Sequence, residues 1–182
     1  MHYLYEDIVK LLDKSSQDEF FRRFLDDLGE SPQYGNGCYV FPQSGFCLIC
    51  DKGTFVSAFF HVATEAVRSG DVQSFVGKLP GGIDVTDQRA DIEKKLNGSP
   101  LRSRLVRGRN EDQEKCYWDD YPYLSFVVTT CLDAASDQIR AVALTSKSGS
   151  APSDLPFYGQ PPKMRTGPER RRLTGRRSRH DG

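Results

Sequence analysis

The sequence predicts an α+β fold: two helix-plus-β-hairpin repeats forming one antiparallel sheet, with helices packed on one face and a disordered basic C-terminal tail. Two segments with helical apolar spacing end in the same Leu-x-x-Ser-Pro motif, at residues 28–32 and 96–100. A Cys-Tyr pair follows each motif, at residues 38–39 and 116–117, and two β-forming runs across an acidic turn come after each pair. The recurrence of this order indicates an internal repeat.

The first repeat follows a short amphipathic segment. Residues 3–12 carry Ile8 and Leu11 among apolar residues at helical spacing, which predicts a first helix. Residues 16–28 predict a second helix, because Ser16 and Glu19 form a capping-box pattern and Gly29 is a typical C-terminal stop. Residues 38–62 are rich in β-forming residues on both sides of the Gly-containing turn at 51–53, and so predict a β-hairpin.

The second repeat begins at residue 77. A turn at residues 80–82 is followed by Asp87 or Thr86 as N-cap of a helix that ends at residues 97–98. Residues 101–115 are highly charged and predict an exposed loop. Residues 124–131 and 138–144 then form the two strands of the second hairpin, across a turn at 133–137.

The second half also carries a family resemblance. The run Leu-Pro-Gly-Gly-Ile at 79–83, then Asp87-x-Arg89, then Leu96 with Pro100, resembles an uncharacterised family with Leu-Pro-x-Gly-Ile/Leu, an Asp-x-Arg helix start and Leu-Gly-x-Pro. Residues 41–45 and 51–52 resemble its first half, so the similarity covers roughly residues 17–145. The repeated order is similar to β-lactamase-inhibitor-protein-like and small outer-membrane-assembly lipoprotein folds. This resemblance implies a protein that binds other proteins and is not an enzyme.

Composition predicts one globular domain over residues 1–147, with repeats at about 16–76 and 77–147, and a disordered tail over 148–182 rich in Pro, Gly, Ser and Arg. Residues 163–182 hold eight of the 25 basic residues and two of the 25 acidic ones. This leaves 17 basic and 23 acidic residues before them, a net charge of −6. We therefore expect no nucleic-acid contact except a weak one through residues 163–182, and no membrane partner. No leader or long apolar run is evident and the five cysteines are odd in number, so the sequence predicts a cytoplasmic protein with reduced thiols.

The candidate binding residues are aromatic side chains and two neighbouring arginines. Tyrosine and tryptophan are enriched at the energetic centres of protein interfaces, because they bury a large area with little loss of rotamer freedom. The alternative is that the aromatic residues fill the layer between helix and sheet. The candidate surface comprises Tyr117, Trp118, Tyr121, Tyr123, Arg107 and Arg109.

Sites for catalysis, metal or cofactor are weakly indicated. Cys47 and Cys50 have C-x-x-C spacing, but residues three apart in a strand point to opposite faces. His61 is expected to be structural, and the acidic residues near Arg89 to cap a helix. No complete phosphate-binding loop is present, so we predict no catalytic residue, metal or cofactor.

The sequence-based hypothesis is therefore a non-enzymatic intracellular protein-binding module of unknown partner. It would use the open face of the sheet or the corner at residues 117–123. One alternative is a small hydrolase that depends on a thiol or on His61, and another is contact with nucleic acid or an acidic partner through the basic tail.

Overall fold

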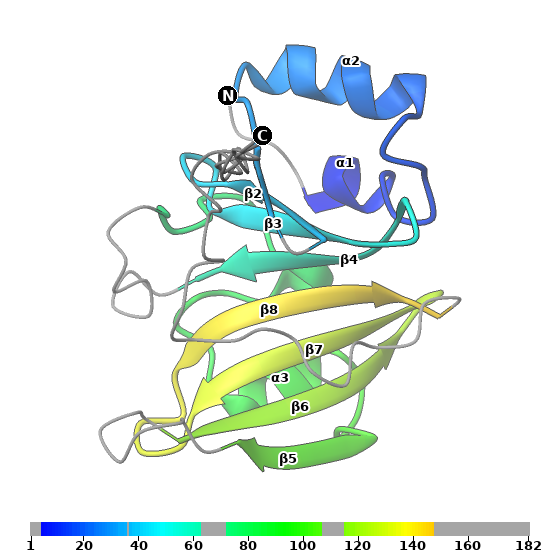
Figure 1. The fold of residues 1–182 in the computed structure, drawn as a ribbon. Helices are drawn as coiled ribbons and strands as arrows, with labels where there is room; N and C mark the ends of the chain where they lie inside the picture. The colour runs from blue at the N-terminus through cyan, green and yellow to red at the C-terminus, as the bar shows by residue number, and fades with distance from the viewer. Residues whose placement is uncertain (1–4, 36, 63–71, 107–114, 148–182) are drawn as a thin grey trace, which may run out of the picture.

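The computed structural model describes residues 5–35, 37–62, 72–106 and 115–147, and its main element is one eight-stranded antiparallel sheet (Figure 1). The strands lie in the order β1-β2-β3-β4-β8-β7-β6-β5. In chain order the elements are α1 (Tyr5–Val9), α2 (Glu19–Leu28), β1 (Gln33–Gly35), β2 (Cys38–Phe41), β3 (Phe46–Asp51), β4 (Thr54–His61), the 3-10 helix η2 (Pro80–Gly82), α3 (Arg89–Lys95), β5 (Arg102–Val106), β6 (Cys116–Tyr123), β7 (Phe126–Asp133) and β8 (Ile139–Ser146).

The sheet consists of two meanders of four strands that meet at its centre. β4 pairs with β8, so that Phe59 lies opposite Ala143 and His61 lies opposite Ala141. The strands that begin each meander, β1 and β5, are therefore the two outer edges of the sheet. Among the described strands, the other six each have a neighbour on both sides, so β1 and β5 are the strands open to further pairing there.

Helix α2 forms where its apolar stripe and caps predict a helix. Its N-cap is Asp18, whose carboxylate accepts the N–H of Phe20 at 2.8 Å, and not Ser16 as the sequence suggested. Phe21 and Phe24 lie one turn apart and meet the sheet edge-on; the ring centroids of Phe21 and Phe55 are 4.7 Å apart. The helix ends at Gly29, whose φ of 67° is a conformation that glycine adopts readily.

Helix α3 has a different cap from the one predicted. Gln88 is its N-cap and donates its backbone N–H to the Asp91 carboxylate at 3.2 Å. Asp87, predicted as the cap, instead accepts the N–H of Asp84 at 2.7 Å and pairs with Lys95 at 2.6 Å. Its carboxylate therefore closes the turn before the helix and ties that turn to the last helical turn.

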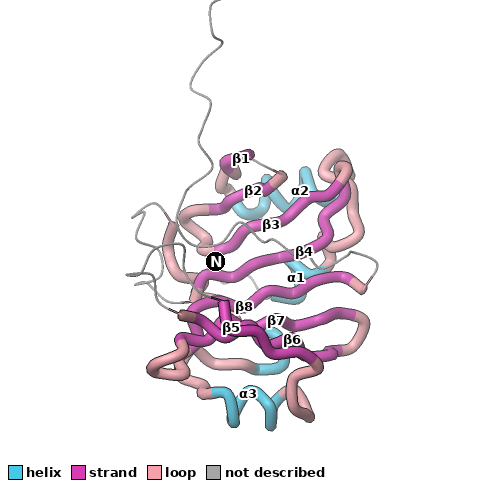
Figure 2. Tube along the Cα trace, turned by 60° about the horizontal axis from the view of Figure 1, so that its bottom comes forward, coloured by secondary structure: helices cyan, strands magenta, loops and turns pink. Residues whose placement is uncertain are grey.

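The predicted fold class was wrong in the weight given to helices. Each of α2 and α3 is followed by four strands and not by a two-stranded hairpin, and the three α-helices have only five, ten and seven residues. α1 and α2 lie beside β2–β4, whereas α3 lies near β6 and β7 (Figures 1 and 2). The structure is therefore mostly one eight-stranded sheet with a few short helices, and not the two helix-plus-hairpin repeats with helices packed on one face that the sequence predicted.

The predicted loop over residues 101–115 was also wrong in its first part. Arg102–Val106 is β5, which pairs with Cys116–Asp120 of β6. Residues 107–114 of that loop lie outside the described residues, as does the predicted tail over 148–182.

Buried side chains lie on both faces of the sheet. A large cluster joins residues of all three α-helices to one face, and includes Phe21, Ile92, Tyr121 and Leu144. A smaller cluster on the other face comprises Phe59, Trp118, Cys131, Ala141 and Ala143, with Cys47 and Cys116 packed against it. Among the described residues, no helix is long and apolar enough to cross a membrane.

Candidate functional site

Strand alternation places the four candidate aromatic residues on two different faces. Tyr121 is fully buried in the large cluster, and Tyr117 and Tyr123 pack partly buried against the same cluster. Trp118 is 6% exposed and belongs to the smaller cluster on the other face. Neighbouring residues of a strand point in opposite directions, so adjacency in sequence does not make one surface here. The structure does not describe the two candidate arginines, Arg107 and Arg109.

Arg89 joins the start of α3 to β6. Its Nε lies 2.8 Å from Oδ2 of Asp119, whose side chain is fully buried, and its guanidinium carbon lies 4.5 Å from the ring centroid of Tyr117. The Arg89 backbone N–H also donates to Asp137 at 3.4 Å, in the turn before β8. These contacts combine an ion pair with a cation–π interaction, and they hold the helix against the sheet.

Buried polar groups surround this ion pair. Burial, followed by the nearby Asp119 carboxylate, raises the pKa of the Tyr121 hydroxyl above its ordinary range, so the hydroxyl stays protonated. Neither Tyr121 Oη nor Thr130 Oγ1 has a hydrogen-bond partner among the described residues. These polar groups are buried, and we interpret them as a structural contact that holds α3 against the sheet.

The edge strand β5 is more accessible than the aromatic residues beside it. Leu105 and Val106 are 46% and 45% exposed, and Leu101, just before the strand, is 74% exposed. β5 pairs only with β6 among the described strands, so one side of its backbone has no strand partner there. An edge strand with exposed apolar side chains is a template for pairing with another chain.

Two arginines lie on the face of β5 that Val106 shares, opposite to the face of Leu105. Arg102 is opposite Asp120 and Arg104 is opposite Trp118 in the register with β6. Arg104 approaches Asp120 at 3.5 Å, and Asp120 also accepts the hydroxyl hydrogen of Thr129 at 2.7 Å. Arg102 is exposed and has no ion-pair partner among the described residues.

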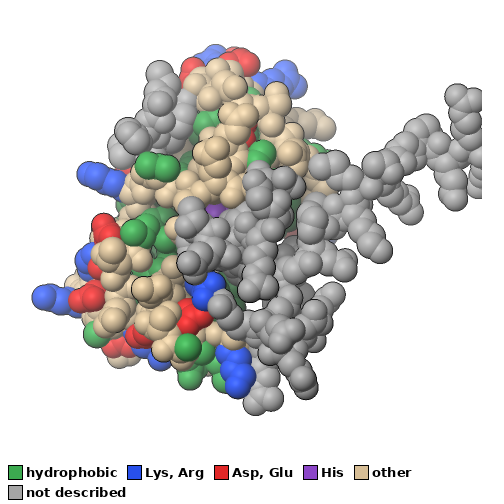
Figure 3. Space-filling view, turned by 90° about the vertical axis from the view of Figure 1, so that its left-hand side faces the viewer, with side chains coloured by type: hydrophobic (Ala, Val, Ile, Leu, Met, Phe, Trp, Pro, Cys, Tyr) green, Lys and Arg blue, Asp and Glu red, His purple; other side chains and the backbone are tan. Residues whose placement is uncertain are grey.

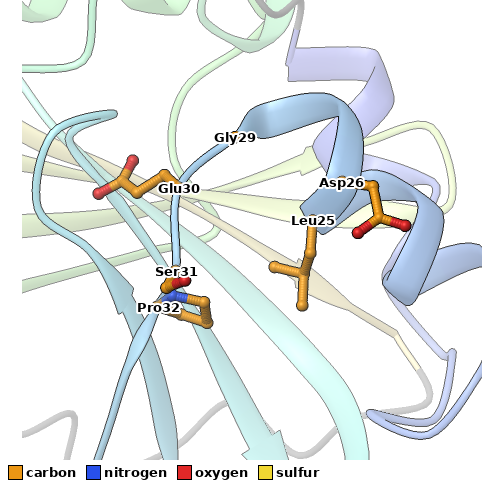
Figure 4. A pocket seen from close by; sticks show the side chains of 6 residues that line it. All are labelled: Leu25, Asp26, Gly29, Glu30, Ser31 and Pro32. Atoms are coloured by element: carbon orange, nitrogen blue, oxygen red, sulfur yellow. The ribbon is translucent and has the colours of Figure 1, made fainter.

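A shallow pocket lies at the C-terminal end of α2. It has a volume of about 400 Å³ and is lined by Leu25, Asp26, Gly29, Glu30, Ser31 and Pro32. Asp26 and Glu30 point in opposite directions, away from Leu25 (Figure 4). The Glu30 carboxylate accepts hydrogen bonds from the backbone of Gln43 and from the backbone and hydroxyl of Ser44. Its acceptor capacity is thus used to hold the turn between β2 and β3, and the two acids do not converge on a ligand.

The described residues give no support for a nucleophilic pair of a thiol and His61. Burial raises the pKa of Cys38, Cys47 and Cys50, and a hydrogen bond with Cys116, together with burial, raises that of Cys131. Burial lowers the pKa of His61 to about 4, and its Nδ1 has no hydrogen-bond partner among the described residues. Raised thiol pKa values disfavour the thiolate that nucleophilic catalysis requires.

Metal and charge patterns add no further site. Within the described ranges, no group of three or more His, Cys, Asp and Glu side chains is arranged to hold a metal ion. Cys47 packs against the smaller cluster and Cys50 against the large one, so the C-x-x-C sulfurs lie on opposite faces, as expected. Acidic and basic side chains are interspersed along the margin of the face in Figure 3, and no patch of one sign dominates it.

Comparisons with known proteins found similarity only among solved structures, because neither a family model nor a curated protein matches the sequence. A cysteine-rich secretory protein from Staphylococcus aureus subsp. aureus Mu50 is 14% identical, with a TM-score of 0.44 over 76% of this chain and 44% of that chain. An extracellular protein containing an SCP domain, from Bacillus anthracis str. Ames, is 12% identical, with a TM-score of 0.46 over 77% of this chain and 45% of that chain. The chain thus spans less than half the length of either protein.

Two predictions from the sequence can be set beside these neighbours. They are described as a secretory and an extracellular protein, whereas the sequence predicted a cytoplasmic location, and that prediction is withdrawn. Neither is described as a β-lactamase-inhibitor-like protein, so the resemblance drawn from the sequence gains no support from them. The likeness is too low to assign an activity or a partner to this chain.

Proposed function

We propose that the protein is a non-enzymatic protein-binding module, and that its partner adds an extended strand to the β5 edge of the sheet. One observation carries this proposal: β5 is an outer strand whose apolar residues Leu105 and Val106 are nearly half exposed. In strand addition, main-chain hydrogen bonds supply affinity, and the side chains next to the edge supply specificity.

The opposite edge is less suited to this role. β1 has only three residues, follows Pro32 directly and ends at Gly35. Its exposed Tyr34 already lies against a neighbour, since the ring centroids of Tyr34 and Tyr39 are 4.6 Å apart. A short edge flanked by proline is a common protection against unwanted pairing. β5 has five residues and no proline.

Charge favours an acidic partner over a second copy of this chain. Arg102 and Arg104 are two residues apart and therefore lie on the same face of β5. If two copies paired β5 antiparallel about residue 103 or 104, arginines would lie opposite arginines, which is destabilising. An extended segment with acidic residues at alternate positions would instead place opposite charge beside Arg102 and beside Arg104, which already approaches Asp120.

The test places a photo-crosslinking residue at position 105 of the full-length protein, in an extract of the source cells. The control carries the same residue at Leu124, an exposed leucine in the turn between β6 and β7. The proposal expects a partner that is labelled from position 105 and not from 124. With that partner purified, Leu105→Glu should weaken binding at least tenfold, about 1.4 kcal/mol, while Leu124→Glu leaves it unchanged. Equal labelling from both positions, or full affinity of the folded Leu105→Glu variant, would contradict the proposal.

A further inference from the structure

Four of the five cysteines occur in pairs that have the same register in the two halves of the sheet. Cys38 on β2 lies opposite Ile49 on β3, and Cys47 is two residues before Ile49. Cys116 on β6 lies opposite Asp133 on β7, and Cys131 is two residues before Asp133. In each half, therefore, one cysteine lies diagonally across from the other on the neighbouring antiparallel strand.

The two members of each pair share a face of the sheet, because residues two apart in a strand point to the same side. Cys116 and Cys131 both belong to the smaller cluster, Cys131 as a buried member and Cys116 packed against it. Their thiols are close enough to form a hydrogen bond. The thiol of Cys47 is likewise close enough to Cys38 for that neighbour to influence its ionisation.

The expected spacing is slightly beyond the usual range for a disulfide. Diagonal neighbours on antiparallel strands have Cα atoms about 7–8 Å apart, and disulfides usually join Cα atoms about 4.4–6.8 Å apart. A link therefore requires a local movement that brings the two strands closer, and the hydrogen bond between the thiols of Cys116 and Cys131 makes theirs the more favourable pair. Asp133 and Leu132 lie beside a register shift in β7, where pairing with β8 is already irregular.

We propose that Cys116 and Cys131 form a reversible thiol–disulfide site across β6 and β7. This inference does not depend on the proposed partner-binding function. Cys116 is partly exposed and Cys131 is fully buried, so Cys116 reacts first and Cys131 resolves the intermediate. The oxidant is a low-molecular-weight disulfide of the glutathione class.

The chemistry is two successive exchanges. The deprotonated Cys116 sulfur attacks one sulfur of the small disulfide, whose S–S bond breaks, and one small thiol leaves with the electron pair and takes up a proton. Cys131 then loses its proton and attacks the Cys116 sulfur of the mixed disulfide, which releases the second small thiol. Two protein thiols are oxidised and one disulfide is reduced to two thiols. Since thiolate is the reacting species, the exchange is expected to accelerate as the pH rises above neutrality.

Cys50 provides the matched control. It packs against the large cluster on the opposite side of the sheet, so it cannot reach either member of the proposed pair without unfolding. Cys50→Ser is therefore expected to leave the oxidation of Cys116 and Cys131 unchanged. Cys131→Ser is expected to abolish the internal link and leave glutathione attached to Cys116.

The experiment equilibrates the folded full-length protein with oxidised glutathione, alkylates the remaining thiols in denaturant and maps the peptides by mass spectrometry. The expected result is a peptide pair linked through Cys116 and Cys131, lost again on treatment with reduced glutathione, with Cys50 alkylated. Alkylation of both Cys116 and Cys131 after oxidation, or linkage of either to a different cysteine, would overturn the proposal. The wild-type mapping decides the matter even where a serine variant does not fold.

Discussion

Replacing Arg89 with methionine is expected to destabilise the fold by about 3 kcal/mol. The partner carboxylate of Asp119 is fully buried, whereas the Arg89 side chain is 30% exposed. Removing one member of a buried ion pair costs about 3–5 kcal/mol, because the other charge stays buried without compensation. The partial exposure of Arg89 places this cost near the lower end of that range. Loss of the cation–π contact with Tyr117 adds about 0.5–1 kcal/mol at most.

Urea unfolding monitored by the fluorescence of Trp118, the single tryptophan, measures the change. Arg23→Met is the control, since Arg23 and its partner Glu19 are 72% and 75% exposed, and such a pair contributes at most about 1 kcal/mol. Adding Asp119→Asn to Arg89→Met should recover part of the loss and give a coupling energy above about 1 kcal/mol. A loss below about 1 kcal/mol for Arg89→Met, or no coupling with Asp119, would refute the assignment of a buried ion pair.

Three further predictions concern pH and backbone conformation. Burial lowers the pKa of His61 from 6.5 to about 4, so between these pH values His61 is protonated in the unfolded chain and neutral in the folded one. The free energy of unfolding should therefore fall by up to about 3 kcal/mol as the pH falls from 6.5 to 4. His61→Gln should remove this pH dependence in urea titrations. Burial alone would raise the pKa of Asp133, but hydrogen bonds from the following turn and from Arg140 outweigh it and lower the pKa to about 2; its contribution should be complete above pH 4 and be lost toward pH 2, and acid unfolding of Asp133→Asn should lack this component. Gly45→Ala should lower the melting temperature far more than Gly53→Ala, although both glycines have a positive φ. Of these two, only Gly45 would place the added Cβ against backbone, within 2.5 Å of a carbonyl oxygen. Equal shifts of the melting temperature would contradict this.

Helix α2 could be predicted because its determinants are local. The apolar positions Phe21 and Phe24 and the stop at Gly29 all lie within one short segment. The cap was misplaced by two residues because Ser16 and Asp18 are both good caps, and tertiary contact decides between them. The backbone N–H of Ser16 is used by the carbonyl oxygen of Gly53, in the turn between β3 and β4.

Strands β5 and β6 could not be recognised from local preference. β5 carries arginines and serine, and β6 contains Asp119, Asp120 and Pro122, residues that are uncommon in strands. Asp119 is tolerated because Arg89 approaches it from α3, and Asp120 because it accepts the hydroxyl hydrogen of Thr129. Pro122 lies beyond the residues of β6 that pair with β5, so its missing N–H breaks no bond on that side. These conditions are set by distant parts of the chain.

The cysteine pairs show how the register adds information that spacing lacks. Cys38 and Cys47 are nine residues apart, whereas Cys116 and Cys131 are fifteen apart, so the two pairs look unrelated in the sequence. They become equivalent only when β2 is aligned on β3 and β6 on β7. The repeated Cys-Tyr motif relates Cys38 to Cys116 in the sequence. The turns between the strands differ in length, and this difference conceals the equivalence of Cys47 and Cys131.

The topology also changes the role of the candidate aromatic residues. Because β4 pairs with β8 at the centre of the sheet, β1 and β5 are the edges, in the part of the chain that the structure describes, at which a strand from another protein can extend it. A strand added to β5 would lie directly beside its side chains. Of these, Leu105 and Arg104 lie opposite Tyr117 and Trp118 of β6. The aromatic side chains are then one strand removed from the partner, buried in the two clusters that hold β6 in place. Their contribution to binding would come through the position and rigidity of β5, and the side chains that determine the partner would be those of β5 itself.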